Sequence, residues 1–123
     1  MLPDTALPLD PAAPAAILPQ GAERESVVAF LRAGSPILST TAKAPDVFDE
    51  GTGDVVPMSL RSDGEWVWSD AHAYYLGRYG VVTDAAFLEH IRRRDFRCAV
   101  LDDAACATVL ESFYAAGDEE DPT

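Results

Sequence analysis

The chain has 123 residues, with 21 acidic against 9 basic residues and a formal net charge of -12 at pH 7. Its length predicts one domain, and its charge argues against nucleic acid or an anionic membrane surface as a partner, since both require a basic surface. Its two cysteines, Cys98 and Cys106, are too few for a disulfide scaffold and lack the flanking ligands of a zinc site.

Residues 1–20 predict an extended or disordered arm rich in proline and alanine, because five prolines interrupt any helix or strand there. They contain no basic segment ahead of an apolar run, and no stretch of the chain approaches the roughly 18 apolar residues of a membrane span. We therefore expect a cytoplasmic protein. Gly117 is expected to end the last helix, so that residues 117–123 form an acidic tail and residues 21–116 a single domain.

The first predicted helix covers residues 22–33, where apolar residues recur at helical spacing: Val27, Phe30 and Leu31. Gly34 is expected to end this helix. A short strand is predicted over residues 35–41, and residues 43–53 are expected to form a loop.

Residues 55–68 predict a β-hairpin, in which either of two loops is conceivable. A two-residue loop at Asp63-Gly64 would place Arg61 opposite Trp66. A three-residue loop, which adds Ser62, places Arg61 opposite Glu65 as a cross-strand ion pair. The three-residue loop is favoured because it gathers the large apolar side chains on one face: Met58, Leu60, Trp66 and Trp68. It predicts that both tryptophans belong to the core.

Three helices are predicted after the hairpin. The first covers residues 70–79 between an N-cap at Ser69 and a stop at Gly80. Thr83 is expected to cap a helix that runs to about Arg94, and the last helix starts at residue 102 or 103. Residues 98–101 form either a brief strand or a buried connection. The predicted class is α+β, with a small antiparallel sheet around the central hairpin packed against three to four helices.

The sequence contains no motif for catalysis, a metal or a cofactor. Four acidic residues lie in or beside the predicted loop, and their spacing does not fit a calcium-binding loop: Asp46, Asp49, Glu50 and Asp54. Asp63 and Glu65 are expected to serve the hairpin turn and the ion pair with Arg61. No serine or cysteine has the sequence context of a catalytic nucleophile, so His72 and His90 are expected to be ordinary surface or boundary histidines.

Part of the chain resembles a class of small actinobacterial proteins of unassigned activity. The resemblance covers residues 55–96 and rests on the hairpin sequence of residues 55–68 and on three short motifs: Tyr74-Tyr75-Leu76, Tyr79-Gly80 and Phe87-Leu88-Glu89-His90-Ile91. Some of these proteins are similar to the immunity partners of toxins. The resemblance implies a single-domain binding protein that blocks a toxin by occupying its active cleft.

Charge and resemblance together predict an acidic immunity or inhibitor protein that is not an enzyme, needs no cofactor, and acts by stoichiometric binding to a basic protein partner. The expected contact residues are acidic, aromatic or arginine side chains: Asp46, Asp49, Glu50, Asp54, Arg61, Glu65, Tyr74 and Arg78. One alternative is a regulatory or scaffold module that dimerises through its aromatic face. A small enzyme that uses His72, Asp70 and Arg61 is the last alternative.

Overall fold

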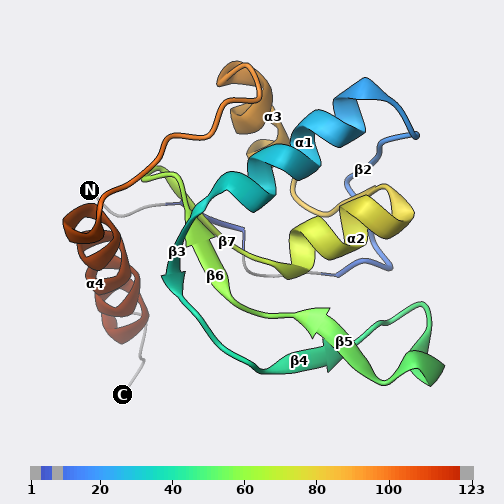
Figure 1. Cartoon of the computed structure of the whole chain (residues 1–123), viewed down its shortest axis with the longest axis horizontal. Helices are drawn as coiled ribbons and strands as arrows, with labels where there is room; N and C mark the ends of the chain where they lie inside the picture. Colours follow the sequence, from blue (N-terminus) through green and yellow to red (C-terminus); the bar gives the residue numbers. More distant parts are fainter. Residues whose placement is uncertain (1–3, 7–9, 120–123) are drawn as a thin grey trace.

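The computed structural model describes residues 4–6 and 10–119, and for Glu50 and residues 116–119 it describes the backbone alone (Figure 1). These residues form an α+β fold, as predicted. A four-stranded sheet has helix α4 (Asp103–Glu119) on one face, and three helices cover the other face: α1 (Ala22–Ala33), α2 (Ala71–Tyr79) and α3 (Ala85–Arg93). None of the described helices has the length and apolar character needed to cross a membrane.

The main sheet contains β1 (Asp4–Ala6), β7 (Trp66–Ser69), β6 (Leu60–Ser62) and β3 (Ser35–Leu38), in that spatial order. Strands β3, β6 and β7 pair antiparallel, whereas β1 pairs parallel to β7. Two further antiparallel pairs complete the strands: β2 (Ala16–Ile17) with β8 (Val81–Val82), and β4 (Lys43–Pro45) with β5 (Asp54–Pro57). A short 3₁₀ helix, η1 (Glu50–Thr52), lies between β4 and β5.

The two ends of the chain differ from expectation where they are described. The N-terminal segment is extended but not separate from the domain, since β1 and β2 pair with later strands and Ala6 and Leu18 are buried in the main core. Helix α4 continues through Gly117 to Glu119, so the predicted stop at Gly117 is wrong. Residues 120–123 of the expected acidic tail lie outside the described residues. The predicted loop over residues 43–53 contains β4 and η1.

The hairpin has neither of the two registers weighed from the sequence. Ser62 pairs with Val67 and Arg61 with Trp68, which leaves four residues between the last paired positions. Arg61 and Trp68 therefore share one face of the sheet. Leu60 lies on the opposite face, where it packs in the cluster beneath α4. The predicted placement of Leu60 beside the tryptophans, and the predicted Arg61–Glu65 ion pair, are both wrong.

Trp68 is the centre of the main core, as the sequence predicts. It is fully buried, packs against Phe30 and Phe87 at ring-centroid distances of 5.7 Å and 5.2 Å, and donates its indole N–H to the carbonyl of Leu31 at 3.0 Å. A Cβ atom at Gly34 would lie 2.3 Å from the Trp68 ring, so only glycine fits where α1 ends. Gly34 thus both ends the helix and lets the sheet approach it.

Candidate functional site

One buried carboxylate, that of Asp46, attaches the turn after β4 to helix α2. Its Oδ2 atom accepts hydrogen bonds from the hydroxyl groups of Tyr74 at 2.6 Å and Tyr79 at 2.7 Å. Its Oδ1 atom accepts the backbone N–H of Phe48 at 2.8 Å, which is the geometry of an Asx turn. Both carboxylate oxygens are therefore satisfied inside the protein, and the group Asp46, Tyr74 and Tyr79 is called the Asp46 cluster below.

The charges of the Asp46 cluster follow from these bonds. Burial raises the pKa of the Asp46 carboxyl, but hydrogen bonds from Tyr74, Tyr79 and the Phe48 N–H, together with the charge of Arg78, outweigh burial and hold that pKa below its usual value. The hydrogen bond to Asp46 raises the pKa of Tyr74 to about 12, and also raises the pKa of Tyr79. Asp46 thus stays ionised and both tyrosines stay protonated near neutral pH, so the cluster supports the turn and does not exchange protons.

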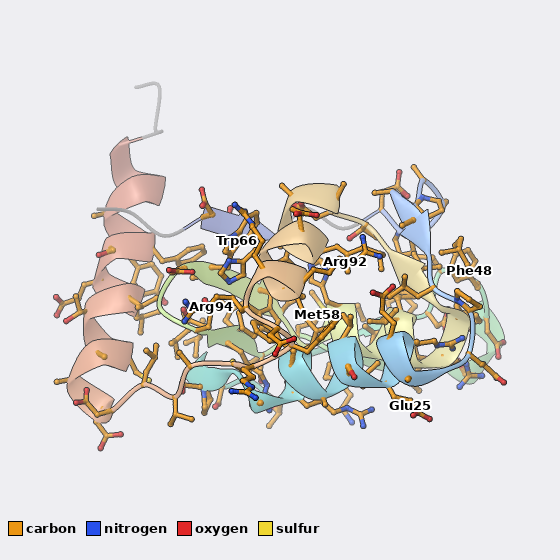
Figure 2. All side chains as sticks on the ribbon, turned by 90° about the horizontal axis from the view of Figure 1, so that it is seen from above. Glu25, Phe48, Met58, Trp66, Arg92 and Arg94 are labelled. Atoms are coloured by element: carbon orange, nitrogen blue, oxygen red, sulfur yellow. The ribbon has the colours of Figure 1, made fainter. Side chains whose placement is uncertain are left out.

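The turn held by the Asp46 cluster presents apolar and charged side chains to solvent. Val47 is 50% exposed and Phe48 is 47% exposed, although the Phe48 ring packs edge-on against Tyr79 at 4.9 Å. Beside them the guanidinium of Arg78 lies 3.6 Å from the carboxylate of Asp49. We call Val47, Phe48, Asp49 and Arg78 the Phe48 surface. Figure 2 shows Phe48 at the end of the molecule opposite α4.

The structure brings together half of the residues expected at the partner-binding surface: Asp46, Asp49, Tyr74 and Arg78. Glu50 follows directly in η1, and Asp54 starts β5 with an exposed side chain. Of this group, Asp46 and Tyr74 support the turn from inside, whereas Asp49 and Arg78 are available at its surface.

Arg61 has a structural environment of its own. Its Nε atom donates to the carboxylate of Asp70 at 2.6 Å, and a terminal nitrogen donates to the backbone carbonyl of Gly34 at 2.8 Å. These bonds join β6 to the end of α1 and to the start of α2. The partner of Arg61 is therefore Asp70, and Glu65 contacts a different residue, His90.

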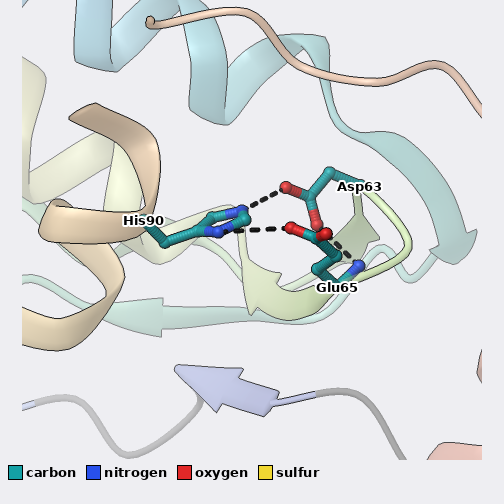
Figure 3. A group of neighbouring side chains, drawn as sticks. All are labelled: Asp63, Glu65 and His90. Carbon is teal, nitrogen blue, oxygen red and sulfur yellow. Dashed lines mark hydrogen bonds and ion pairs between the residues drawn. The ribbon is translucent and has the colours of Figure 1, made fainter. Parts of the chain in front are cut away.

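Asp63, Glu65 and His90 form a second group, at the tip of the hairpin (Figure 3). The Oδ1 atom of Asp63 accepts the backbone N–H groups of Glu65 at 3.0 Å and Trp66 at 2.9 Å, while its Oδ2 atom lies 2.6 Å from Nε2 of His90. The other ring nitrogen, Nδ1, lies 3.4 Å from a carboxylate oxygen of Glu65. Asp63 and His90 are buried, whereas the Glu65 side chain is 58% exposed.

Both histidines are buried, so the expectation that they are ordinary surface or boundary residues is wrong. A ring nitrogen of His72 bonds the carbonyl of Ala6 in β1, and burial lowers the pKa of His72. Among the described residues, no hydrogen bond or ion pair joins His72 to Asp70 or Arg61. Of the three residues considered for a small enzyme, Arg61 and Asp70 pair with each other, whereas the ring of His72 bonds the carbonyl of Ala6.

Sequence reasoning missed four contributors to the Asp46 cluster, the Phe48 surface and the group at the hairpin tip: Val47, Phe48, Tyr79 and His90. A local signal existed for the turn, because aspartate side chains commonly accept the backbone N–H two residues later, as Asp46 does from Phe48. Tyr79 lies 33 residues from Asp46 and His90 lies 27 residues from Asp63, and no local pattern indicates contacts over such separations.

Comparisons with protein-family models, with curated proteins and with solved structures found no significant match to this chain.

Proposed function

We propose that this chain is a binding protein for a basic protein partner, that the Phe48 surface is its main contact, and that the partner is a toxin neutralised by one-to-one binding. The observation that carries the proposal is the exposure of Val47 and Phe48 on a turn that the Asp46 cluster fixes in place. A rigid turn loses little conformational entropy on binding, so exposed apolar side chains on it are well suited to be binding anchors.

The charges around the Phe48 surface support a basic partner. Asp49 is half exposed, Asp54 is exposed, and the whole chain carries a net charge of -12. Such a field raises the association rate of a basic protein and lowers that of acidic competitors. An apolar centre beside polar and charged residues is also the usual composition of a protein interface.

The proposal is tested with the toxin-like product of a gene adjacent to the one for this chain. We expect the two proteins to co-purify, and co-expression to restore growth that the toxin alone suppresses. Replacing Phe48 by Ala is expected to weaken binding by about 30-fold, the effect of a typical hot-spot residue. Tyr114 offers a matched control, since it is 52% exposed and lies on α4, away from the Phe48 surface.

Two results would contradict the proposal: no binding of the wild-type chain to the basic product, or equal loss of binding for Phe48→Ala and Tyr114→Ala. The association rate should also fall as salt is added, because the attraction is screened. A rate that does not depend on salt would remove the electrostatic part of the proposal.

Dimerisation through the aromatic face, the alternative considered from the sequence, has less support. The two tryptophans of that face pack against Phe30 and Phe87 in the core. Light scattering over a range of concentrations distinguishes the two ideas, because a self-associating scaffold becomes larger with concentration and a one-to-one inhibitor does not.

A further inference from the structure

We propose that His90 and Glu65 bind a divalent transition-metal ion of the zinc type, with Asp63 holding the histidine in position. The site lies at the tip of the β6–β7 hairpin: Asp63 and Glu65 belong to the loop between the two strands, and His90 belongs to α3 (Figure 3). It is built from residues that take no part in the Phe48 surface, so it stands or fails independently of the proposed function.

The orientation of the His90 ring is determined by its packing and by its contact with Asp63. Its side chain is only 7% exposed, and its ring packs parallel to Phe87 and edge-on to Phe30. We assign a proton of His90 to Nε2, because the carboxylate oxygen of Asp63 that lies 2.6 Å away can accept it. The lone pair of a neutral His90 is then on Nδ1, which faces Glu65 (Figure 3).

Asp63 is itself held firmly, because its other oxygen accepts two backbone N–H groups of the hairpin turn. A carboxylate that accepts a hydrogen bond from one histidine nitrogen while the other nitrogen faces a ligand position is the usual support of metal-binding histidines. Among the described residues, Nδ1 of His90 makes no hydrogen bond. Nδ1 thus faces the carboxylate of Glu65 at 3.4 Å without a hydrogen bond.

The distance between the two prospective ligand atoms suits a metal ion. Nδ1 of His90 and the nearer oxygen of Glu65 are 3.4 Å apart, beyond the usual range of about 2.7–3.2 Å for an N–H···O hydrogen bond. Two ligands at about 2.1 Å from a metal, separated by a tetrahedral angle of about 109°, lie about 3.4 Å from each other. A nitrogen ligand favours zinc-type ions over magnesium or calcium, which prefer oxygen.

The exposure of Glu65 and the negative charge around it also favour binding of a metal ion. The side chain of Glu65 is 58% exposed, so an ion can reach it from solvent and water can fill the remaining positions around the metal. Two carboxylates lie at the site and the whole chain is strongly negative, which raises the local concentration of cations.

The test is calorimetric titration of the full chain with zinc chloride, in excess magnesium chloride so that exposed carboxylates are occupied. We expect one saturable site. The variant Glu65→Gln should weaken zinc binding at least tenfold without loss of fold, since the side chain is exposed. In Asp63→Asn, the new amide donates to Nε2 and forces the proton onto Nδ1, and the expected weakening is about 10–100-fold.

Glu25→Gln is the matched control, because Glu25 is an exposed glutamate on α1, and it should bind zinc as the wild type does. A Cys98→Ser, Cys106→Ser double variant should also bind, which excludes the thiols as ligands. Histidine-selective NMR should show zinc changing the Nδ1 signal of His90 and leaving His72 unchanged. The proposal is overturned if zinc shows no saturable binding up to about 1 mM, if Glu65→Gln binds as tightly as wild type, or if the double variant does not bind.

Discussion

Two buried aspartates, Asp46 and Asp63, stabilise two turns in the same way but leave different groups at the surface. Each uses Oδ1 to accept backbone N–H groups of its own turn. Each uses Oδ2 to attach that turn to a helix, Asp46 to α2 and Asp63 to α3. The two turns therefore share one structural solution, in which a buried charge is neutralised by local and long-range donors at once.

The difference lies in the donors. The phenols that bond Asp46 have no second polar atom, so this cluster is complete, and what remains for a partner is the apolar surface of Val47 and Phe48. The imidazole that bonds Asp63 has a second nitrogen, and that nitrogen reaches the solvent-facing carboxylate of Glu65. The Asp46 cluster has no free polar atom, so it supports a surface for a protein partner. The group at the hairpin tip keeps a histidine nitrogen that can bind a ligand.

Replacing Asp63 by Ala should have the largest effect on stability. The change removes the acceptor of two backbone N–H groups and leaves His90 buried without its carboxylate. We expect the free energy of unfolding to fall by about 3 kcal/mol, measured by urea titration, because removing one member of a buried pair leaves the other uncompensated. Asp63→Asn should lose less, since its remaining oxygen can still accept the turn N–H groups.

The control for this prediction is Glu65→Gln. Its side chain is mostly exposed, so the expected loss is no more than about 0.5 kcal/mol. Similar losses for Asp63→Ala and Glu65→Gln would mean that the contact of His90 with Asp63 contributes little, and the comparison of the two turns would fail.

The Asp46 cluster should be visible in the titration of Tyr74. The hydrogen bond to Asp46 raises the pKa of Tyr74 from 10.0 to about 12, so the folded chain keeps this proton longer than the unfolded chain does. The corresponding stability is complete below pH 10 and is lost as the pH rises from 10 towards 12. In Asp46→Asn, the Tyr74 ring signals in an NMR pH titration should move back towards a pKa of 10.0. An unchanged titration would show that Asp46 does not determine the ionisation of Tyr74.

His72 is a buried histidine for comparison with His90; within the described part of the chain it forms no ion pair, and its ring bonds the carbonyl of Ala6. Burial lowers the pKa of His72 below 6.5, so near this pH the unfolded chain binds more protons than the folded chain. The stability that depends on a neutral His72 is therefore complete above pH 6.5 and falls as the pH decreases below 6.5. Urea midpoints measured between about pH 8 and pH 5 should fall less steeply in His72→Gln than in wild type. Equal slopes would rule out His72 as a source of the pH dependence.

The elements that could be predicted from sequence are those set by local patterns. Helix α1 has its predicted bounds because apolar spacing and a terminal Gly34 are both local signals. The end of α2 at Gly80 was likewise predicted, and Gly80 adopts the left-handed conformation with φ of 75°. The class of the fold follows from such elements, since each must bury one face against another.

The hairpin register could not be predicted, because side chains extend the turn. The hydroxyl of Ser62 donates to the carbonyl of Trp66 at 2.7 Å and accepts the N–H of Gly64 at 2.9 Å. Asp63 then accepts two more N–H groups, so side chains satisfy three of the four backbone N–H groups of the loop. The rules that predict the loop length from the position of a glycine consider backbone conformation alone and do not include hydrogen bonds from side chains. They also gave no indication of β1, whose pairing with β7 joins residues about 60 positions apart.

Replacing Arg78 by Gln tests whether a residue of the Phe48 surface can contribute to binding without contributing to stability. Of the changes predicted here, it should have the smallest effect on stability. The side chain is 50% exposed, and its nearest carboxylate atoms lie 3.6 Å away in Asp49 and 3.9 Å away in Asp46. We expect the melting temperature to change by less than about 2 °C, since exposed ion pairs contribute little.

The affinity of Arg78→Gln for a basic partner should nevertheless change, because Arg78 packs over the rings of Tyr74 and Tyr79 and orients Asp49. Calorimetry of unfolding and of binding on the same sample distinguishes the two effects. If instead the melting temperature falls as far as in Asp46→Asn, the charge of Arg78 is needed to keep Asp46 buried. The Asp46 cluster would then depend on an exposed residue, and a partner that engages Arg78 would loosen the turn that it binds.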